Sequence, residues 1–274
     1  MKKHIGIIGG GAAGMMAAVT AARKGTKVTI LERNDRIGKK ILQTGNGKCN
    51  LGNKNLTVEC YHGGDAAWIK QALERFGTED TVCFFQKIGL LIKEKNGYLY
   101  PVSEQAASVL DVLRYELQTL GVEIIYGGKV QKLGRTLSGK LVVNDGDREW
   151  QFDAVILTCG GKAAPGTGSD GSGWKIAKKA GHTCIAPVPA LVQLRCLETD
   201  LLKGIAGVRA DSRVRILCDG RETDVERGEL QLTEYGISGI PIFQLSRDVN
   251  YLLRDRKTVM AEIDFLPDMT ELQA

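Results

Sequence analysis

The first hydrophobic segments of the chain differ in their spacing. Residues 4–8 (HIGII) form an apolar run that ends at Gly9, which predicts a buried strand. Residues 12–24 are rich in alanine and methionine and stop at Gly25, which predicts a helix with a glycine terminator. Residues 27–31 (KVTIL) are β-branched and predict a second strand. Strand, helix and strand in this order predict a βαβ unit in a parallel sheet.

The middle of the chain mixes helical and extended patterns. We expect helices over residues 65–76 and 103–120, the second with Ser103 as a possible cap, and a hairpin turn at Asn96–Gly97. Short strands at 122–126, 129–133, 140–143 and 149–152 then predict an antiparallel meander. A buried strand at 154–158 and a short helix at 172–180 follow it.

The pattern changes again from Pro187 onward. Strand-rich segments with one helical piece around residues 241–253 predict a second domain built mainly on β structure, so we divide the chain into domains at 1–187 and 188–274. The final residues, LPDMTELQA, predict a helix that begins at Asp268. Because the chain stops in the first turns of that helix, we expect it to be a fragment of a longer protein.

Composition and charge narrow the class of protein. The chain has 34 glycines and only 6 prolines, which suits tight turns and close backbone approach to a ligand better than disorder. The 37 basic and 32 acidic residues give a net charge of +5, with no basic run longer than two residues. A nucleic-acid-binding protein more often shows a basic stripe, so nucleic acid is a less favoured partner, although RNA is not excluded. We expect a small-molecule substrate, and the oligomeric state stays open.

The cysteines and the N-terminus indicate a location. Seven widely spaced cysteines include no CxxC pair, so they predict neither a disulfide framework nor a zinc site. The histidines at positions 4, 62 and 182 also lack ligand spacing, and we expect no metal. The apolar start is short and broken by glycines, unlike a signal peptide, and no stretch is long enough to span a membrane. We therefore expect a cytoplasmic protein without a membrane partner.

A glycine fingerprint carries the first chemistry. Residues 9–14 (GGGAAG) read as GxGxxG between the first predicted strand and helix. Gly9 allows the tight turn, Gly11 lets a pyrophosphate approach the backbone, and Gly14 lets the helix pack against the strand. Glu32 ends the second strand, where it would accept hydrogen bonds from an adenosine ribose and repel the 2′-phosphate of NADP. The fingerprint predicts a dinucleotide site but does not separate FAD from NAD.

The loop GKKILQTGNGKCN, residues 38–50, follows this fingerprint. It is not a P-loop, because no glycine lies five positions before Gly47 and Cys49 replaces the Ser or Thr that follows Gly-Lys. It is too polar for a buried strand and too rich in glycine for a stable helix. We interpret it as a loop that follows the cofactor with its lysines and peptide N–H groups.

Four segments together resemble one family. GIIGGGAAGMMAA, GKKILQTGNGKCN, ILTCGGKAAPGTGSDGSGWKIAKKAGH and GELQLTEYGISGIPIFQLS are similar to segments of the bacterial HI-type, or aminoacetone-oxidase-like, FAD-binding flavoproteins. The resemblance implies an α/β fold with a Rossmann-like FAD-binding domain of the GR2 type, in three layers with a β-meander. It also implies an inserted β-rich domain. Lys48 stands where the family usually has Arg, so the charge is kept without the bidentate fork.

The resemblance also implies a set of cofactor-binding residues around non-covalent FAD. The pyrophosphate would meet the glycine turn, Glu32 and Arg33 would meet ribose and adenine, and Val130 would meet adenine through its backbone. The complete set is Gly9, Gly11, Ala12, Ala13, Gly14, Glu32, Arg33, Lys39, Lys40, Gly45, Gly47, Cys49, Asn50, Val130, Cys159, Gly160 and Gly161. No side chain is assigned as a catalytic acid or base.

The implied function is that of an FAD-dependent oxidoreductase. We expect flavin-mediated hydride transfer from NADH or NADPH to an activated C=C bond of a small molecule. The alternatives are an amine oxidase that uses O₂, a dihydrouridine synthase acting on ribosomal RNA, and a non-catalytic fragment that only binds the dinucleotide.

Two further motifs have two readings each. The turn GTGSDGSG, residues 166–173, is expected on the flavin side of the cofactor, or else is a helix-entry loop capped by Asp170 or Ser172. In the segment 233–239, Tyr235 and Ser238 are either active-site polar groups or parts of a plain turn.

Overall fold

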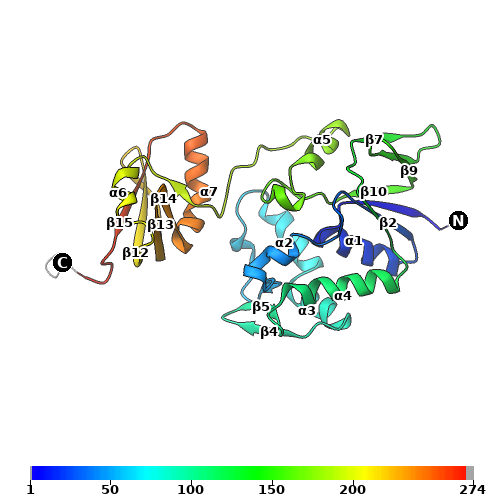
Figure 1. The fold of residues 1–274 in the computed structure, drawn as a ribbon, viewed down its shortest axis with the longest axis horizontal. Helices are drawn as coiled ribbons and strands as arrows, with labels where there is room; N and C mark the ends of the chain where they lie inside the picture. Colours follow the sequence, from blue (N-terminus) through cyan, green and yellow to red (C-terminus); the bar gives the residue numbers. More distant parts are fainter. Residues whose placement is uncertain (1, 270–274) are drawn as a thin grey trace. The chain divides into compact units, whose positions relative to one another are not determined.

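Four parallel strands form the sheet that carries the first part of the chain. They are β1 (His4–Ile8), β2 (Lys27–Glu32), β6 (Glu123–Tyr126) and β10 (Ala154–Leu157), in the order β10-β1-β2-β6 (Figure 1). All their pairings are parallel. The predicted βαβ unit is therefore confirmed, with helix α1 (Ala12–Arg23) as the crossover between β1 and β2.

The computed structural model describes residues 2–269. The chain divides into two compact units, residues 1–184 and 185–274, and this division lies close to the predicted boundary after residue 187. That the second unit is a domain inserted into a cofactor domain stays a prediction.

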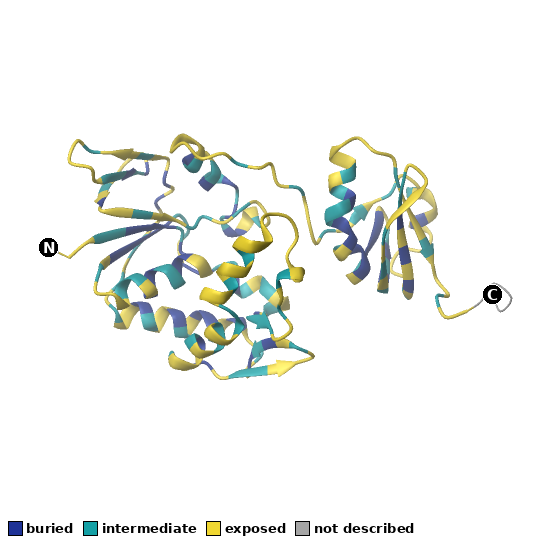
Figure 2. Ribbon diagram, turned by 180° about the vertical axis from the view of Figure 1, so that it is seen from behind, coloured by how far each residue is buried: buried dark blue, intermediate teal, exposed yellow. Residues whose placement is uncertain are grey.

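The first unit has three layers, because both faces of its sheet are covered. One face packs against α1 and α4 (Ala106–Thr119), and this core contains Ile7 and Ile30. The other face packs against the meander β7 (Lys132–Arg135), β8 (Leu141–Asn144) and β9 (Glu149–Phe152), and this core contains Ile8 and Leu31. Neighbouring residues of one strand thus point to opposite cores, as the period of a strand requires. Figure 2 shows the buried strands between these layers.

The first strand of the predicted meander belongs elsewhere. The sequence groups residues 122–126 with the meander, whereas β6 pairs in parallel with β2 and only β7, β8 and β9 form the antiparallel sheet. The reason is that β6 follows helix α4, and a helical crossover returns the chain parallel to the strand beside it.

A small subdomain lies between β2 and α4. It comprises a turn of 3₁₀ helix (Ile41–Gly47), β3 (Gly52–Asn53), a second 3₁₀ turn (Val58–Cys60), α2 (Ala66–Arg75), α3 (Thr78–Lys87), β4 (Ile92–Lys95) and β5 (Tyr98–Pro101). Asn96 and Gly97 form the turn of the β4–β5 hairpin with φ of 53° and 82°, which confirms the predicted hairpin. Helix α4 begins later than predicted, with Gln105 as its N-cap, and the Ser103 hydroxyl accepts a hydrogen bond from the Gln105 N–H.

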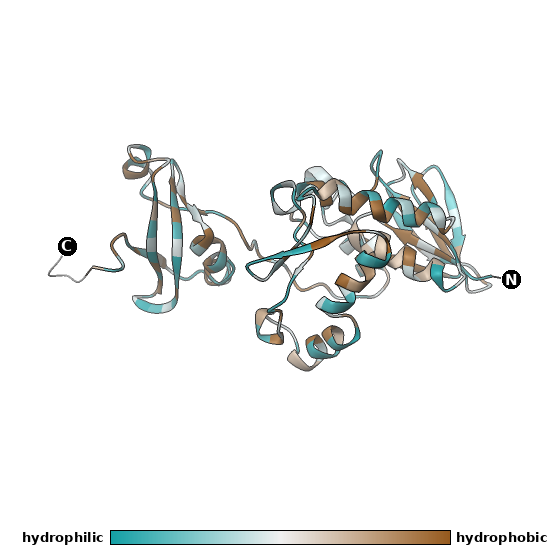
Figure 3. Ribbon diagram, turned by 90° about the horizontal axis from the view of Figure 1, so that it is seen from below, coloured by the Kyte–Doolittle hydropathy of each residue, from teal (hydrophilic) through white to brown (hydrophobic). Residues whose placement is uncertain are grey.

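The second unit is an antiparallel sheet with a helix on one face. Its elements are β11 (Leu194–Arg195), α6 (Thr199–Lys203), β12 (Arg209–Cys218), β13 (Arg221–Thr233), β14 (Gly236–Gly239), α7 (Ile240–Arg254) and β15 (Val259–Asp264). Along β12, Ser212, Val214 and Ile216 are buried while the arginines between them are exposed. This alternation places one face of the sheet against α7 and the other in water. Figure 3 shows it as bands of hydrophilic and hydrophobic colour along the strands.

Two expectations remain untested: the helix predicted from Asp268 and the cytoplasmic location. The helix predicted from Asp268 falls mainly on residues 270–274, outside the described residues. Among residues 2–269, no helix combines the length and the apolar character needed to cross a bilayer. The cytoplasmic location stays a prediction.

The packing of α4 in the core beneath the parallel sheet leads to a prediction about stability. Leu117 of α4 is fully buried, whereas Tyr115 on the same helix is 70% exposed. Replacing Leu117 by Ala leaves a cavity, so we expect Leu117→Ala to lower the free energy of unfolding by about 2–5 kcal/mol in chemical denaturation. Tyr115→Ala is the control and should change it by less than about 0.5 kcal/mol. Equal effects of the two substitutions would contradict this packing.

Candidate functional site

The turn between β1 and α1 is held by close backbone contacts. Gly9 has φ of +107°, and a Cβ atom there would lie 2.7 Å from the Thr158 carbonyl oxygen. A Cβ atom on Gly14 would lie only 1.9 Å from the Gly9 carbonyl oxygen. The Thr158 hydroxyl donates hydrogen bonds to the carbonyls of Ile8 and Gly9, at 3.0 and 2.8 Å. Gly9 and Gly14 are therefore required by the fold itself.

Gly11 is different, because the protein does not fill the space beside it. A Cβ atom on Gly11 would meet no atom within 4 Å. Its backbone is extended, with φ of −76° and ψ of −173°, which any residue adopts. Gly11 is the N-cap of α1, so the N–H groups of the first turn have no acceptor within the helix and point toward this space. The backbone thus offers unpaired donors and the positive end of a helix dipole to an anion.

A pocket of about 280 Å³ opens at this helix N-terminus. Its lining comes from the carboxyl ends of β1, β2 and β10 and from three loops: Ile8, Gly9, Gly11, Ala12, Ala13, Leu31, Glu32, Arg33, Asn34, Gly38, Lys39, Lys40, Ile41, Thr44, Gly128, Lys129, Val130, Thr158, Cys159, Gly160, Thr167, Gly168, Ser169 and Ser172. Ligands of open α/β sheets bind at this edge, outside the carboxyl ends of the strands.

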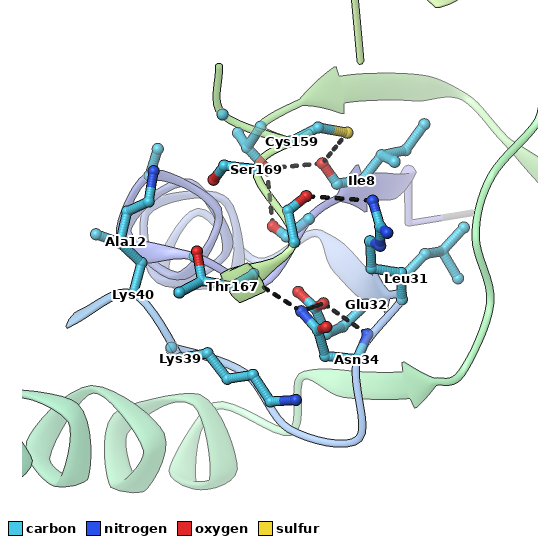
Figure 4. A pocket seen from close by; sticks show the side chains of 18 of the residues that line it. Ile8, Ala12, Leu31, Glu32, Asn34, Lys39, Lys40, Cys159, Thr167 and Ser169 are labelled. Atoms are coloured by element: carbon cyan, nitrogen blue, oxygen red, sulfur yellow. Dashed lines mark hydrogen bonds between the residues drawn. The ribbon is translucent and has the colours of Figure 1, made fainter. Parts of the chain in front are cut away.

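Glu32 lies at the floor of the pocket and is 6% exposed. Its Oε2 accepts a hydrogen bond from the Gly10 N–H at 2.7 Å, and its Oε1 accepts from the backbone and side-chain nitrogens of Asn34 at 2.8 and 2.7 Å. A carboxylate has about four acceptor positions, so three are used inside the protein and one is left for a ligand. Glu32 thus braces the glycine turn as well as facing the pocket (Figure 4).

The turn 166–173 closes the Glu32 end of the pocket. The Asp170 carboxylate pairs with Arg33 at 2.7 Å and with Lys129 at 3.3 Å. Arg33 also donates to the Gly168 carbonyl, and Asn34 donates to the Thr167 carbonyl, both at 3.2 Å. We call these contacts of residues 33, 34, 129 and 167–170 the Asp170 clasp. The turn therefore lies beside Glu32 and Arg33, the end for which the family resemblance implies ribose and adenine, and its expected place on the flavin side stays a prediction.

Asp170 also has a role at the helix that follows. Its Oδ1 accepts a hydrogen bond from the Ser172 N–H at 3.0 Å, where α5 (Ser172–Lys179) begins. Hydrogen bonding by the Ser172 hydroxyl and by Arg33 holds the pKa of the Asp170 carboxyl well below its usual range. The Asp170 carboxylate is therefore ionised at neutral pH, where it pairs with Arg33 and Lys129. The capping role weighed from the sequence is present together with the clasp.

Two lysines of the loop after β2 face the pocket with different partners. Lys39 forms an ion pair with Asp35 at 2.6 Å. Lys40 forms no ion pair within the described part of the chain, and Figure 4 shows its side chain beside Ala12 at the N-terminus of α1. Lys40 is therefore the cation that is best placed to add to the helix dipole toward an anion.

The turn at residues 45–50 is bent but lies outside the pocket lining. Gly45, Asn46, Gly47 and Cys49 all have positive φ values between 54° and 81°. Lys48 pairs with Glu104 at 2.7 Å, and Glu104 also pairs with Lys93. Lys48 and Lys93 lower the pKa of the Glu104 carboxyl to about 2. Of this loop, only Ile41 and Thr44 line the pocket together with the residues before them.

Neither cysteine near the site is prepared for redox chemistry. Cys49 is buried in the core below the sheet, and burial raises the pKa of its thiol, with a smaller opposite effect of the Thr44 hydroxyl. Cys159 lines the pocket and donates to the Ile8 carbonyl at 3.4 Å. Burial, followed by the charges of Glu32 and Asp170, raises the pKa of Cys159 to about 11. Both thiols stay protonated at neutral pH, which disfavours a nucleophilic role.

The structure brings most, but not all, of the predicted site residues together. Gly9, Gly11, Ala12, Ala13, Glu32, Arg33, Lys39, Lys40, Val130, Cys159 and Gly160 line the pocket. Gly14, Gly45, Gly47, Cys49, Asn50 and Gly161 do not. Gly14 supports the turn from below, and Gly161 lies against the indole of Trp174, with 3.4 Å from its ideal Cβ to the ring. Whether any of these residues contacts a cofactor stays a prediction.

Sequence reasoning missed several lining residues. Asn34, Gly38, Thr44, Gly128, Lys129, Thr158 and the turn residues Thr167, Gly168, Ser169 and Ser172 all face the pocket. Asn34, Lys129 and Thr158 adjoin predicted site residues, so their positions carried a signal. The sequence also indicated the turn residues as candidates, because a glycine-rich segment before a helix resembles the first fingerprint. Only the fold shows which end of the pocket this turn lines.

Residues 233–239 lie in the second unit, where residues 234 and 235 form the turn between β13 and β14 and residues 236–239 form β14 itself. The Tyr235 hydroxyl donates to the Gln193 side chain, and the Arg195 guanidinium lies over the Tyr235 ring at 5.6 Å. Tyr235 is 42% exposed, whereas Ser238 is buried in the sheet. Among the described residues, no group of three or more metal-ligating side chains lies together.

The arrangement of the first unit defines its class. A glycine turn that opens a helix, at the carboxyl edge of a parallel sheet with an acidic residue ending the next strand, is the architecture of Rossmann-like dinucleotide-binding proteins. A family model described as the HI0933-like protein Rossmann domain matches residues 3–243. The chain belongs to this family, which confirms both the family resemblance and the Rossmann-like fold class predicted from the sequence.

Curated relatives carry enzyme names. The chain is 46% identical over 272 residues to the 3-dehydro-bile acid delta(4,6)-reductase of Clostridium scindens, covering 98% of this chain and 66% of that protein. It is 31% identical over 267 residues to the ribosomal RNA dihydrouridine synthase of Haemophilus influenzae, covering 96% of this chain and 64% of that protein. The chain thus spans just under two thirds of the length of the curated relatives that it matches.

Solved structures show a weaker likeness. The 3-ketosteroid-delta4-(5alpha)-dehydrogenase of Rhodococcus jostii RHA1 aligns with a TM-score of 0.48 and 17% identity, over 79% of this chain and 57% of that one. The family match places the chain among proteins with this Rossmann domain, and one of its curated relatives is named as a reductase.

The Asp170 clasp leads to a prediction about loop mobility. Asp170→Asn removes the charge that holds Arg33 and Lys129, so we expect amide hydrogen exchange of residues 167–172 to become several-fold faster. Asp200→Asn, which removes a single ion pair with Lys203 in the second unit, is the control and should leave these amides unchanged.

The same clasp predicts a pH dependence. Because the pKa of Asp170 is depressed in the fold, its stabilisation is fully present above the unfolded pKa of about 3.9 and is lost as the pH falls below it. Exchange of these amides, corrected for its intrinsic rate, should thus stay constant from about pH 7 to 5 and increase only in stronger acid. Unchanged protection in Asp170→Asn at neutral pH would show that the clasp does not hold the loop.

Proposed function

We propose that this chain forms the FAD-binding part of an oxidoreductase that transfers a hydride from NADH or NADPH to an activated C=C bond. The observation that carries the proposal is the space beside Gly11, which the protein leaves empty although the backbone there would accept a side chain. A glycine that the fold does not need, at a helix N-terminus in a pocket, is the arrangement that lets a pyrophosphate approach the backbone.

The residues present fit the dinucleotide part of FAD. The N–H groups of the first turn of α1 and the Lys40 ammonium would hold the pyrophosphate, and the remaining acceptor position of Glu32 would bind a ribose hydroxyl. The backbone of residues 128–130 and the Asp170 clasp would border the adenine end. These lining residues account for the adenosine diphosphate part of FAD, because the helix N-terminus, Glu32 and residues 128–130 all belong to this one pocket.

When bound, FAD supplies the hydride-transfer chemistry through its isoalloxazine ring. The chain's own contribution is to bind and orient the dinucleotide at the edge of the sheet. The high pKa of Cys159 fits this division of roles, because a protonated thiol neither repels a pyrophosphate nor competes as a nucleophile.

The reaction class follows from what the relatives have in common. One is named as a reductase of a 3-dehydro bile acid at its delta(4,6) positions, and another is named for the synthesis of dihydrouridine in ribosomal RNA. Both names describe the addition of hydrogen to a C=C bond that is activated by a carbonyl group. We therefore infer that this class of reaction is shared, with a small 3-oxo steroid-like molecule as the first candidate substrate because that relative is 46% identical.

A uracil base in RNA is the second candidate substrate, supported by the 31% identical relative. No contact or charge in the described residues favours the amine-oxidase alternative or the non-catalytic one. The two retained substrates differ in size and charge, so a direct comparison of turnover separates them.

FAD binding can be tested with two glycines that have opposite roles. We expect the purified chain to bind FAD, with flavin absorbance retained on gel filtration, and to gain about 2.7 kcal/mol of stability at 100 times the Kd. Gly11→Ala should weaken FAD binding at least tenfold, since its methyl group occupies the space of the pyrophosphate. The loss of stability without FAD should stay below about 1 kcal/mol, as for an N-cap Gly→Ala change.

Two further variants are the controls. Gly134→Ala, in β7, also places its methyl group where nothing lies within 4 Å, and it should change neither FAD binding nor stability. Gly14→Ala should instead destabilise the chain itself, because its Cβ would overlap the Gly9 carbonyl. A chain that folds but takes up no FAD, or a Gly11→Ala variant that binds FAD normally, would overturn the proposed site.

The reaction is tested next with the flavin-loaded chain. We expect anaerobic NADH or NADPH to bleach the flavin absorbance, and a 3-oxo bile acid with conjugated C=C bonds to restore it. Loss of the conjugated C=C absorbance of the steroid would be the independent readout. If a uridine-containing RNA restores the colour and the steroid does not, the second candidate substrate replaces the first. Reoxidation by neither would count against the proposed reaction class.

A further inference from the structure

A second groove of about 390 Å³ lies on the first unit, next to the nucleotide pocket. It is lined by Lys162, Asp170, Gly171, Trp174, Lys175, Lys178 and Cys184, and we call it the lysine groove. Its lining shares no residue with the nucleotide pocket. The two sites are close in sequence, because Gly160 and Ser172, which line that pocket, flank the loop that contributes Lys162, Asp170 and Gly171 to the groove. Helix α5, which supplies Trp174, Lys175 and Lys178 to the lysine groove, stands near β7 (Figure 1).

The indole of Trp174 packs directly against the backbone of Gly161 and Gly171. The Gly171 N–H donates to the Gly161 carbonyl at 3.0 Å, so the two backbones lie side by side. An ideal Cβ would lie 3.2 Å from the indole Cε3 at Gly171 and 3.4 Å from Cζ2 at Gly161. The benzo ring thus packs directly on this backbone while the residue stays half-buried and lines the groove. Such a ring is an ordered surface on which another ring can stack.

Three exposed lysines surround that ring. Lys175 and Lys178 are three residues apart on α5, so they share a face of the helix and repel one another. Lys162 places its stem beside Gly171, with 3.1 Å from an ideal Cβ there to its Cγ atom. None of the three is in an ion pair with another described residue. A bound anion would relieve this repulsion.

The one carboxylate in the lining is already neutralised. Asp170 pairs with Arg33 at 2.7 Å and with Lys129 at 3.3 Å, and it accepts a hydrogen bond from the Ser172 N–H. Its charge is therefore directed to the clasp and does not compensate the lysines. The lysine groove combines uncompensated positive charge with an aromatic ring, the pair of features that binds phosphate and base in nucleotide ligands.

We propose that the lysine groove binds the phosphate group of a second nucleotide ligand, with the base beside Trp174, separately from the dinucleotide pocket. The same chemistry is offered by a free nucleotide and by one nucleotide of an RNA strand. The proposal goes beyond the proposed function and does not depend on FAD being bound, since no residue of this lining also lines the nucleotide pocket.

The test compares two sets of lysines in binding titrations. The ligands are 2′,5′-ADP and a single-stranded RNA dodecamer, measured calorimetrically at two salt concentrations. We expect the triple variant Lys162→Gln, Lys175→Gln, Lys178→Gln to weaken binding at least tenfold and to flatten the salt dependence. The control variant Lys24→Gln, Lys87→Gln, Lys95→Gln removes the same charge from exposed lysines elsewhere and should bind almost normally.

Two more arms separate this groove from the nucleotide pocket. Trp174→Leu should weaken 2′,5′-ADP at least fivefold but leave binding of inorganic pyrophosphate unchanged, because only the base stacks. The triple lysine variant should bind FAD as the wild type does, and saturating FAD should not displace 2′,5′-ADP. Failure of FAD binding alone would affect only the proposed function.

The outcomes decide between the sources of the phosphate and the proposal itself. Tighter binding of 2′,5′-ADP identifies a free nucleotide as the ligand, and tighter binding of the RNA with a steep salt slope identifies a strand. The proposal is overturned if neither ligand binds, if both lysine sets weaken binding equally, or if FAD displaces the ligand completely.

Discussion

The close approach of helix α1 to the turn after β1 is the constraint on which the rest of the structure depends. A Cβ on Gly14 would lie 1.9 Å from the Gly9 carbonyl, and one on Gly9 would lie 2.7 Å from the Thr158 carbonyl. Three segments thus meet with no room for a side chain between them. This contact sets the position of the N-terminus of α1 above the carboxyl ends of β1 and β10, where its unpaired N–H groups face one pocket.

Within one glycine fingerprint, the roles of the glycines separate on physical grounds. A side chain on Gly9 or Gly14 would collide with neighbouring backbone, so a protein with this fold would need both glycines even without a ligand. No contact or backbone angle requires a glycine at position 11, because a Cβ there would lie in open space and the φ of −76° is ordinary. Contacts within the fold therefore explain two of the glycines and leave open space beside the third, which is why the proposed cofactor contact is argued from Gly11.

Charge organises the loop that closes the pocket. Asp170 joins Arg33 at the end of β2 to Lys129 after β6, and it also caps α5 through the Ser172 N–H. One carboxylate thereby connects segments that are far apart in the chain and leaves the lysines of α5 without a compensating acid. The same residue closes the nucleotide pocket on one side and leaves the lysine groove positively charged on the other.

By itself, the sequence determined the βαβ unit, the glycine fingerprint, Glu32, the β4–β5 hairpin and the family, because local period, turn chemistry and motif spacing carry that information. Tertiary structure decided what depends on contacts between distant segments. It placed residues 123–126 in the parallel sheet, since a crossover helix precedes them, and it turned Lys48 toward Glu104, away from the pocket. It also brought residues 167–172 to Glu32, because Arg33 and Lys129 attract Asp170, and no pattern within either segment records that pairing.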